Sequence, residues 1–329
     1  MNESRNDGRA PGAGNAVRGP VVCICGPTAS GKSALADAVA LEIGSDVISV
    51  DAMQVYRGMD IGTAKTPESE RIVPLRMVDV AEPSEDYSVA LFQHDARALV
   101  DERLDGGITP VLCGGTGLYL DAVIDEMDFP SGETGGTARS AYESLAADKG
   151  VEALWELLRT RDPDSAEEIH PNNVRRVVRA LELLDEGTSY AAQHKGLKTR
   201  KPHYRALMWA IKRDRARLYE RIDQRVDLMV DTGLVEEVQG LRERGLLASH
   251  TASQAIGYKE IVEALDGQTT LEEAVELIKR RSRRYAKRQL SWLRRDGRVR
   301  WLDIEALGLD GARDMVVGEL RTQAELTES

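Results

Sequence analysis

The chain has 329 residues, of which 42% are hydrophobic and 30% are charged, and its formal net charge is −11. That length suffices for one large domain or two modest ones, and the acidic balance argues against nonspecific polyanion binding as the main activity. No stretch has the apolar core of a signal peptide or the length of a membrane span, so we expect a cytoplasmic protein without a membrane partner.

The first part of the chain alternates segments typical of strands with segments typical of helices. Residues 20–25, 46–50 and 109–113 are short apolar runs of the kind found in buried strands. Residues 33–43 carry apolar side chains at helical spacing, and Gly44 follows as a stop signal. This alternation predicts an α/β fold built on a parallel sheet.

The middle of the chain has a different character. Residues 129–137 are rich in Pro, Gly, Ser and Thr, and residues 140–186 show only helical periodicity, which predicts a helical insertion. Residues 204–211 form a near-continuous apolar run, so we expect the chain to return there to the central sheet. The predicted organisation is a core over 20–125 and 200–315, a helical insertion domain over 126–199 that receives RNA, a disordered tail over 1–19 and a second tail over 316–329.

A glycine-rich run between the first predicted strand and the first predicted helix fits the P-loop pattern of ATP-binding and other nucleotide-binding proteins. In such a loop the backbone N–H groups surround phosphate oxygens, while Lys32 adds a cation and Ser33 offers its hydroxyl to Mg²⁺. The fold class is therefore a P-loop NTPase-like parallel sheet core with a helical insertion domain. The run consists of Gly26, Pro27, Thr28, Ala29, Ser30, Gly31, Lys32 and Ser33.

A P-loop does not identify the phosphate compound that it binds, and two alternatives stay open. In a small-molecule kinase, Asp79 would hold magnesium and the arginines at 175, 176 and 179 would form a lid. Phosphate release from ATP would identify that activity. A noncatalytic, GTPase-like RNA-binding module is disfavoured because the sequence has no guanine-reading Asn-Lys-x-Asp motif.

Six further segments carry a second pattern: residues 49–65, 114–119, 170–173, 179–182, 257–259 and 287–294. They resemble, in the same order, the signature segments of the tRNA dimethylallyltransferases, the adenine isopentenyltransferase family of bacterial type. The resemblance spans about Val21 to Trp301. Departures are small: Ala52 stands where the bacterial pattern usually has Ser, and Leu75-Arg76 where a His pair is common.

The resemblance implies transfer of a dimethylallyl group from dimethylallyl diphosphate to the exocyclic amine of the adenine adjacent to the anticodon of tRNA, with release of diphosphate. That amine is a poor nucleophile, because its lone pair is delocalised into the ring, so a base must remove a proton as the C–N bond forms. Asp51 follows the second predicted strand at the carboxyl edge of the sheet, near the P-loop, where ligands bind in such folds. An Asp that caps the next helix is the structural alternative. The resemblance implies catalytic roles for Asp51, Thr116 and Arg225.

Leaving-group stabilisation requires positive charge near the diphosphate. Arg217, Arg221 and Arg225 recur every four residues and so lie on one side of a predicted helix. A solvated face explains Arg217, whereas the resemblance implies diphosphate contacts for Arg225 and Arg221 beside the P-loop and Mg²⁺. Thr116, after a glycine pair, is either a substrate-channel residue or an ordinary turn residue.

Recognition of the tRNA anticodon stem-loop is expected from other segments. Arginines at 175, 176 and 179 flank an apolar stripe on one predicted helix, and a solvated helix face is the simpler explanation for them. Residues 279–295 hold a dense cluster of Lys and Arg, which permits a nucleic-acid partner. Tyr285 and Trp292 are either base-stacking or core residues. We expect the protein to act as a monomer. The resemblance implies tRNA contacts for Asp51, Ala52, Met53, Gln54, Thr116, Arg139, Arg175, Arg176, Val177, Val178, Arg179, Gln254, Gly257, Tyr258, Lys259, Lys287, Arg288, Gln289, Trp292 and Arg294.

Overall fold

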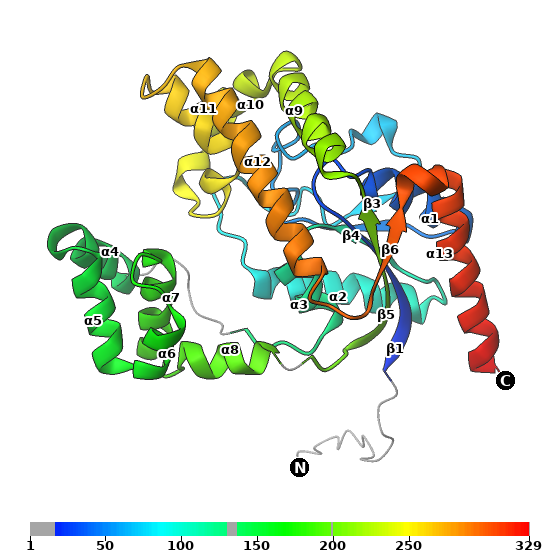
Figure 1. Cartoon of the computed structure of the whole chain (residues 1–329), viewed down its shortest axis with the longest axis horizontal. Helices are drawn as coiled ribbons and strands as arrows, with labels where there is room; N and C mark the ends of the chain where they lie inside the picture. Colours follow the sequence, from blue (N-terminus) through cyan, green and yellow to red (C-terminus); the bar gives the residue numbers. More distant parts are fainter. Residues whose placement is uncertain (1–16, 130–136, 199, 329) are drawn as a thin grey trace, which may run out of the picture.

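The computed structural model of the chain describes residues 17–129, 137–198 and 200–328. Its centre is a six-stranded, fully parallel sheet with the strand order β3-β2-β4-β1-β5-β6 (Figure 1). The predicted α/β fold is therefore confirmed. The strands are β1 (Arg18–Cys25), β2 (Val47–Val50), β3 (Leu75–Arg76), β4 (Val111–Gly114), β5 (Tyr204–Lys212) and β6 (Val299–Asp303).

Helices cover both faces of this sheet, and the side chains of β1 alternate between two apolar clusters. Val22 and Ile24 pack with α1 and α13 on one face, whereas Val21 and Cys23 pack with α2, α3 and α10–α12 on the other. Because both faces are covered, the central strands are apolar throughout. The core helices are α1 (Lys32–Ile43), α2 (Val89–Asp105), α3 (Gly117–Ile124), α9 (Arg215–Asp231), α10 (Leu234–Glu243), α11 (Tyr258–Leu265), α12 (Leu271–Leu293) and α13 (Ile304–Glu328), with 3₁₀ turns at Glu68–Glu70, Leu246–Ala248 and Ala252–Gln254.

The first helix ends where the sequence predicts. Gly44 adopts a left-handed conformation with φ of 66°, and its N–H bonds back to the carbonyls of Ala40 and Leu41. Only glycine adopts this conformation without a steric cost, so it fixes the end of α1. The opposite end of α1 points its first turn at the carboxyl edge of the sheet.

The insertion is a separate bundle with its own small apolar core, and it stands beside the sheet in Figure 1. Leu154, Leu158 and Leu181 are fully buried inside it. The chain enters and leaves through a short two-stranded ribbon, in which Asp125 pairs with Pro202, and the Glu126 N–H donates to the Lys201 carbonyl at 2.7 Å. Its helices are α4 (Thr137–Lys149), α5 (Val151–Arg161), α6 (Pro163–Glu168), α7 (Val174–Asp185) and α8 (Tyr190–Lys198).

The two predicted tails differ from the structure. Residues 316–328 form the second half of α13, and Val316, Val317 and Leu320 are buried against α1, so the expected C-terminal tail is wrong. The apolar residues recur there at helical spacing, which is the signal that indicates a packed helix. Of the predicted N-terminal tail, residues 1–16 lie outside the described residues, and Arg18 already belongs to β1. None of the helices within the described ranges is long and apolar enough to cross a membrane.

The packing of α13 on α1 predicts that its C-terminal half contributes to stability. Leu320→Ala removes a side chain that is only 8% exposed, and we expect a loss of about 2 kcal/mol in the free energy of unfolding. Leu326→Ala, at a side chain that is 74% exposed, serves as the control and should change it by less than about 0.5 kcal/mol. Urea denaturation measures both; equal stabilities of the two variants would contradict the packing role.

Candidate functional site

The P-loop lies between the central strand β1 and the first turn of α1, at the carboxyl edge of the sheet. The loop turns sharply: Ala29 has φ of 61° and Gly31 has φ of 96°, and the Ser30 N–H bonds back to the Pro27 carbonyl at 3.2 Å. A left-handed non-glycine residue such as Ala29 costs about 1–2 kcal/mol, so other contacts must hold the loop in this shape.

Three side chains from distant elements hold the backbone of three consecutive residues of the loop, Thr28, Ala29 and Ser30. Gln289 of α12 accepts a hydrogen bond from the Thr28 N–H at 2.9 Å. Arg221 of α9 donates to the Ala29 carbonyl at 3.0 Å, and Arg213 donates to the Ser30 carbonyl at 2.8 Å. These contacts fix the backbone from outside and leave the interior of the turn for a ligand.

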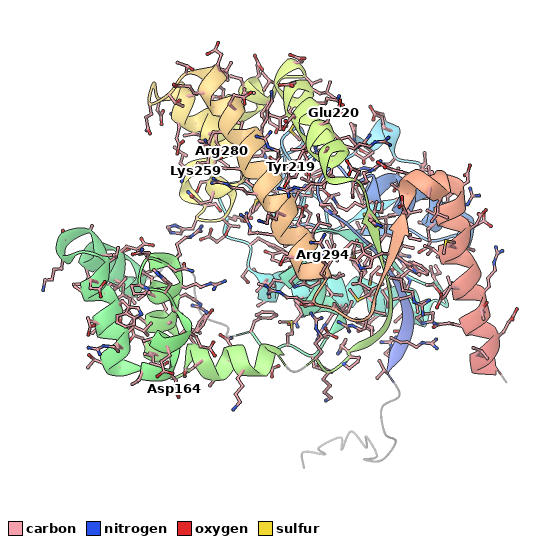
Figure 2. All side chains as sticks on the ribbon, in the orientation of Figure 1. Asp164, Tyr219, Glu220, Lys259, Arg280 and Arg294 are labelled. Atoms are coloured by element: carbon pink, nitrogen blue, oxygen red, sulfur yellow. The ribbon has the colours of Figure 1, made fainter. Side chains whose placement is uncertain are left out.

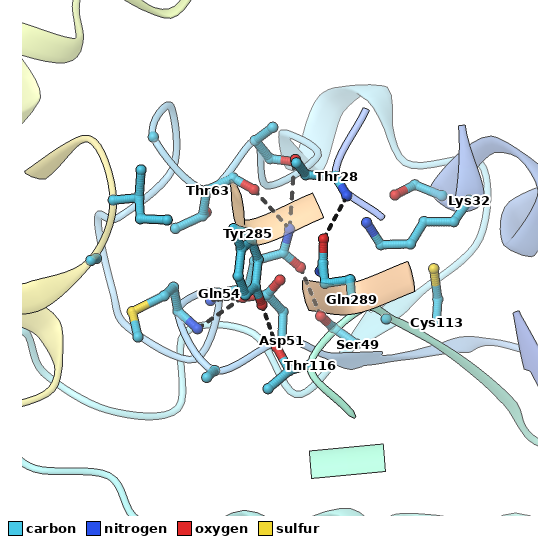
Figure 3. A pocket seen from close by; sticks show the side chains of 18 of the residues that line it. Thr28, Lys32, Ser49, Asp51, Gln54, Thr63, Cys113, Thr116, Tyr285 and Gln289 are labelled. Carbon is cyan, nitrogen blue, oxygen red and sulfur yellow. Dashed lines mark hydrogen bonds between the residues drawn. The ribbon is translucent and has the colours of Figure 1, made fainter. Parts of the chain in front are cut away.

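Two adjacent cavities lie at the P-loop. The smaller, of about 200 Å³, is lined by Arg221 and Arg225 of α9 together with P-loop residues. The larger, of about 270 Å³, extends over the ends of β2 and β4 (Figure 3). Lys32, Ser33 and Arg225 line both, so they lie between the two spaces. Most of the predicted catalytic and P-loop residues line these two cavities: Thr28, Ala29, Gly31, Lys32, Ser33, Asp51, Thr116, Arg221 and Arg225.

Asp51 combines a structural contact with a place in the larger cavity. Its Oδ1 accepts hydrogen bonds from the N–H groups of Met53, at 2.9 Å, and Gln54, at 3.4 Å, so the carboxylate caps a turn and not the helix that the structural alternative expects. Asp51 also lines the larger cavity, and its other oxygen accepts no hydrogen bond within the described part of the chain. The turn therefore fixes one oxygen and leaves the second for a ligand (Figure 3).

The cations around Asp51 are partly stripped of water. Burial lowers the pKa of Lys32, and the nearby Cys113 and Asp51 oppose that effect. Burial likewise lowers the pKa of Arg225, and the nearby Asp51 opposes that effect. Arg225 also donates a hydrogen bond to the Thr63 carbonyl at 3.3 Å. Desolvated cations gain the most from an incoming anion, so this end of the cavity favours a polyanionic ligand.

Thr116 and Tyr285 meet on the other wall of the larger cavity. Their hydroxyl oxygens are 3.4 Å apart, and burial raises the pKa of Tyr285 to about 12. The phenol therefore stays protonated and keeps a donor for Thr116 or for a substrate. This contact joins α12 to the loop after β4 and places Tyr285 in the wall of the larger cavity. Base stacking by Tyr285 stays a prediction.

Glu237 of α10 organises a neighbouring loop and was not identified from the sequence. Its carboxylate accepts the N–H groups of Asp60, Ile61 and Gly62 at 2.7–3.2 Å and the Tyr258 hydroxyl at 2.6 Å. The held loop continues into Thr63, whose carbonyl also accepts from Gln54 at 3.2 Å. No local signal marks Glu237, because it acts on a loop about 175 residues away.

Several residues expected to contact RNA have side chains directed into the protein. Val177 and Val178 are 0% and 1% exposed in the core of the insertion, so the expectation that their side chains contact tRNA is wrong. They belong to the apolar stripe of α7. Tyr258 is fully buried against Glu237, and both ends of the Gln289 amide bond to protein groups.

The arginines of the insertion fall into two groups. Arg139 makes two hydrogen bonds to the buried Glu182, at 2.9 and 3.1 Å, and Arg179 lies 3.5 Å from the same carboxylate. Arg175 and Arg176 are exposed and form no ion pair within the described ranges. Arg139 and Arg179 therefore have a structural partner within the insertion, and their contact with tRNA stays a prediction. The remaining predicted RNA contacts that are exposed are Gln254, Lys287, Arg288 and Arg294, with Lys259 partly exposed.

The carboxylate considered for a kinase has another partner. Asp79 accepts a hydrogen bond from Lys65 Nζ at 2.7 Å, and Lys65 also binds Asp60 at 2.6 Å. Asp79 does not line either cavity. Arg217, as expected, pairs with a surface carboxylate, that of Glu305, at 3.3 Å.

Comparison with known proteins identifies the family. The family model described as IPP transferase matches residues 54–296, and that described as isopentenyl transferase matches residues 19–77. A tRNA dimethylallyltransferase of Carboxydothermus hydrogenoformans is 46% identical over 301 residues, 91% of this chain and 96% of that protein. The chain belongs to the IPP transferase family. A tRNA dimethylallyltransferase of Geobacillus thermodenitrificans is 43% identical over 93% of this chain and 99% of its own length.

Solved structures agree with this membership of the IPP transferase family. The tRNA isopentenylpyrophosphate transferase of Bacillus halodurans is 40% identical, with a TM-score of 0.69 over 95% of this chain and 100% of that one. A eukaryotic dimethylallyltransferase, described as acting on tRNA, is 29% identical with a TM-score of 0.70 over 87% of this chain and 74% of that one. The resemblance noted from the signature segments is thus confirmed.

Proposed function

We propose that this IPP transferase moves a dimethylallyl group from dimethylallyl diphosphate to the exocyclic amine of the adenine adjacent to the anticodon of tRNA, and releases diphosphate. The observation that carries the proposal is the pair of adjacent cavities, which share Lys32 and Arg225 and bring the cationic P-loop close to the free oxygen of Asp51. Relatives named tRNA dimethylallyltransferase support it. We propose the cytoplasm as its location and the monomer as its active form.

The P-loop end is suited to a diphosphate leaving group. As the C–O bond breaks, negative charge grows on the diphosphate, and Lys32, Arg221 and Arg225 surround the space that it would occupy. Magnesium fits this site: Ser33, which carries a hydroxyl, lines both cavities, and Mg²⁺ prefers few protein oxygens together with phosphate oxygens. When bound, the ion would neutralise part of the charge that develops on the leaving oxygens.

The part of the larger cavity beside Asp51, next to the P-loop cations, is suited to the acceptor amine. The adenine nitrogen forms its new bond to the allylic carbon, the carbon–oxygen bond to diphosphate breaks, and the amine proton passes to the free Asp51 oxygen. The turn amides hold that carboxylate in a fixed orientation, which a general base requires. Thr116 and Tyr285 provide hydroxyl groups on the facing wall.

The RNA would bind along the exposed cations near the cavity. Figure 2 shows Lys259 and Arg294 on the core helices that lie nearest to the insertion. Arg175 and Arg176 are exposed on α7 of the insertion itself. An anticodon stem-loop has phosphates on two strands, and cations on both the core and the insertion would contact them.

Asp51→Asn tests the general base. Asparagine keeps an oxygen that accepts the two turn amides, so the loop is preserved while the basic oxygen is lost. We expect single-turnover chemistry to slow by about 100- to 10,000-fold, with tRNA affinity little changed. Rapid-quench measurement of prenylated tRNA provides the test, and an unaltered chemical step would remove Asp51 from the base role.

The nature of the reacting phosphate compound can be tested with labelled ATP. We expect no ATP hydrolysis with or without tRNA, and prenylated tRNA to form from dimethylallyl diphosphate in the absence of ATP, because the P-loop holds dimethylallyl diphosphate. Lys32→Ala and removal of Mg²⁺ by chelation should each weaken substrate binding or slow diphosphate departure. Stoichiometric ATP hydrolysis during product formation would refute the assignment and favour a kinase-like reaction.

The two groups of insertion arginines should behave differently. Arg175→Ala combined with Arg176→Ala should make the slope of log affinity against log salt shallower by roughly 0.7 to 0.9 per lost phosphate contact, without changing the melting temperature. Arg139→Ala is the matched variant: it removes the two hydrogen bonds to buried Glu182, and we expect a stability loss of about 1–3 kcal/mol with an unchanged slope. An unchanged slope in the double variant would exclude those arginines from the RNA site.

A further inference from the structure

One face of α12 contacts the catalytic loops at three successive points. Tyr285, Gln289 and Trp292 are spaced by four and three residues, so they lie on one side of the helix. Tyr285 meets Thr116, and Gln289 reaches both the P-loop and the loop after β4. Trp292 packs so closely on Gly117 that a Cβ there would lie 2.3 Å from its ring.

Gln289 is the centre of this contact. Its Oε1 accepts from the Thr28 N–H at 2.9 Å (Figure 3), and its Nε2 donates to the Gly115 carbonyl at 3.0 Å. The side chain is only 5% exposed. Both ends of the amide are therefore used inside the protein, although the side chain also lines the larger cavity.

The position of Gln289 depends on glycine at 115. A Cβ on Gly115 would lie 2.2 Å from Gln289 Nε2 and 2.7 Å from the Gly26 carbonyl oxygen. The backbone of the loop after β4 can approach α12 and the P-loop this closely only because residue 115 has no side chain. The glycine and the glutamine thus form a matched pair across the site.

The hydrogen bond to Thr28 precedes the most strained part of the P-loop. Ala29 follows directly in the left-handed region, and its carbonyl is held by Arg221. Arg221 also lines the phosphate-side cavity, so a bound anion would compete for its charge. Gln289 is neutral and buried, so an anion has no charge on this side chain to compete for.

We infer that Gln289 is a positioning residue that sets the P-loop in its ligand-binding shape and is not a contact for tRNA. The identity of the ligand as a diphosphate rests on the proposed function; the positioning role itself does not. The exposed neighbours Lys287, Arg288 and Arg294 remain the RNA-facing residues of the same helix. Residue 289 therefore serves the diphosphate step from within a segment rich in RNA-facing charges.

The test uses Gln289→Met, which keeps the length of the side chain but neither hydrogen bond. With inorganic diphosphate and Mg²⁺ as the probe, we expect the dissociation constant to rise about 10-fold, because two hydrogen bonds that shape the loop are lost. The dissociation constant for tRNA should change by less than about twofold. Lys287→Ala is the matched control on the exposed face and should show the opposite pattern, weakening tRNA alone.

Amide hydrogen exchange over residues 26–33 gives a second readout that needs no ligand. It should become faster in Gln289→Met, and also in Gly115→Ala, which displaces the same amide without changing residue 289. Faster exchange in a protein whose wild type binds no diphosphate would support the positioning role and refute the proposed function. Weakened tRNA binding with unchanged diphosphate affinity and exchange would overturn the inference, as would a lowered melting temperature with both affinities and the exchange unchanged.

Discussion

A loop that surrounds a phosphate must turn several backbone N–H groups toward one point, and the left-handed conformation at Ala29 shows the steric cost of that turn. The rest of the site depends on keeping this backbone in place. Side chains of α9, α12 and the segment after β5 form hydrogen bonds with the backbone of three consecutive loop residues. The helices that carry cations toward the ligand thus also preorganise the backbone that binds it, which reduces the reorganisation needed when a substrate arrives.

The parts of the site that could be predicted are those whose signals are local in the sequence. The P-loop pattern, the strand before it and the helix that ends at Gly44 follow from residue spacing and glycine chemistry within a few residues. The position of Asp51 follows from a general rule about where parallel strands end. Its double role as turn cap and cavity residue was not foreseen, because the two interpretations were treated as exclusive although one carboxylate has two oxygens.

The rest could not be predicted because it depends on contacts between distant segments. Gln289 lies among basic residues, so its neighbours indicate RNA binding, yet its amide bonds to a loop about 261 residues earlier in the chain. Val177 and Val178 adjoin arginines in sequence but lie on the opposite side of α7, where helical geometry places them in the core. A signature segment identifies residues that are typical of a family. It does not show whether such a residue binds a ligand or stabilises the fold.

The two-stranded ribbon at the base of the insertion has a further consequence. Because Asp125 and Pro202 are paired neighbours, the chain returns to its starting point after the insertion, and β5 joins the sheet directly beside β1. The register of the sheet is therefore independent of how long the insertion is or how its helices pack. Descendants of such a chain can lengthen, shorten or reshape the insertion to suit different RNA surfaces while the catalytic edge of the sheet is inherited unchanged.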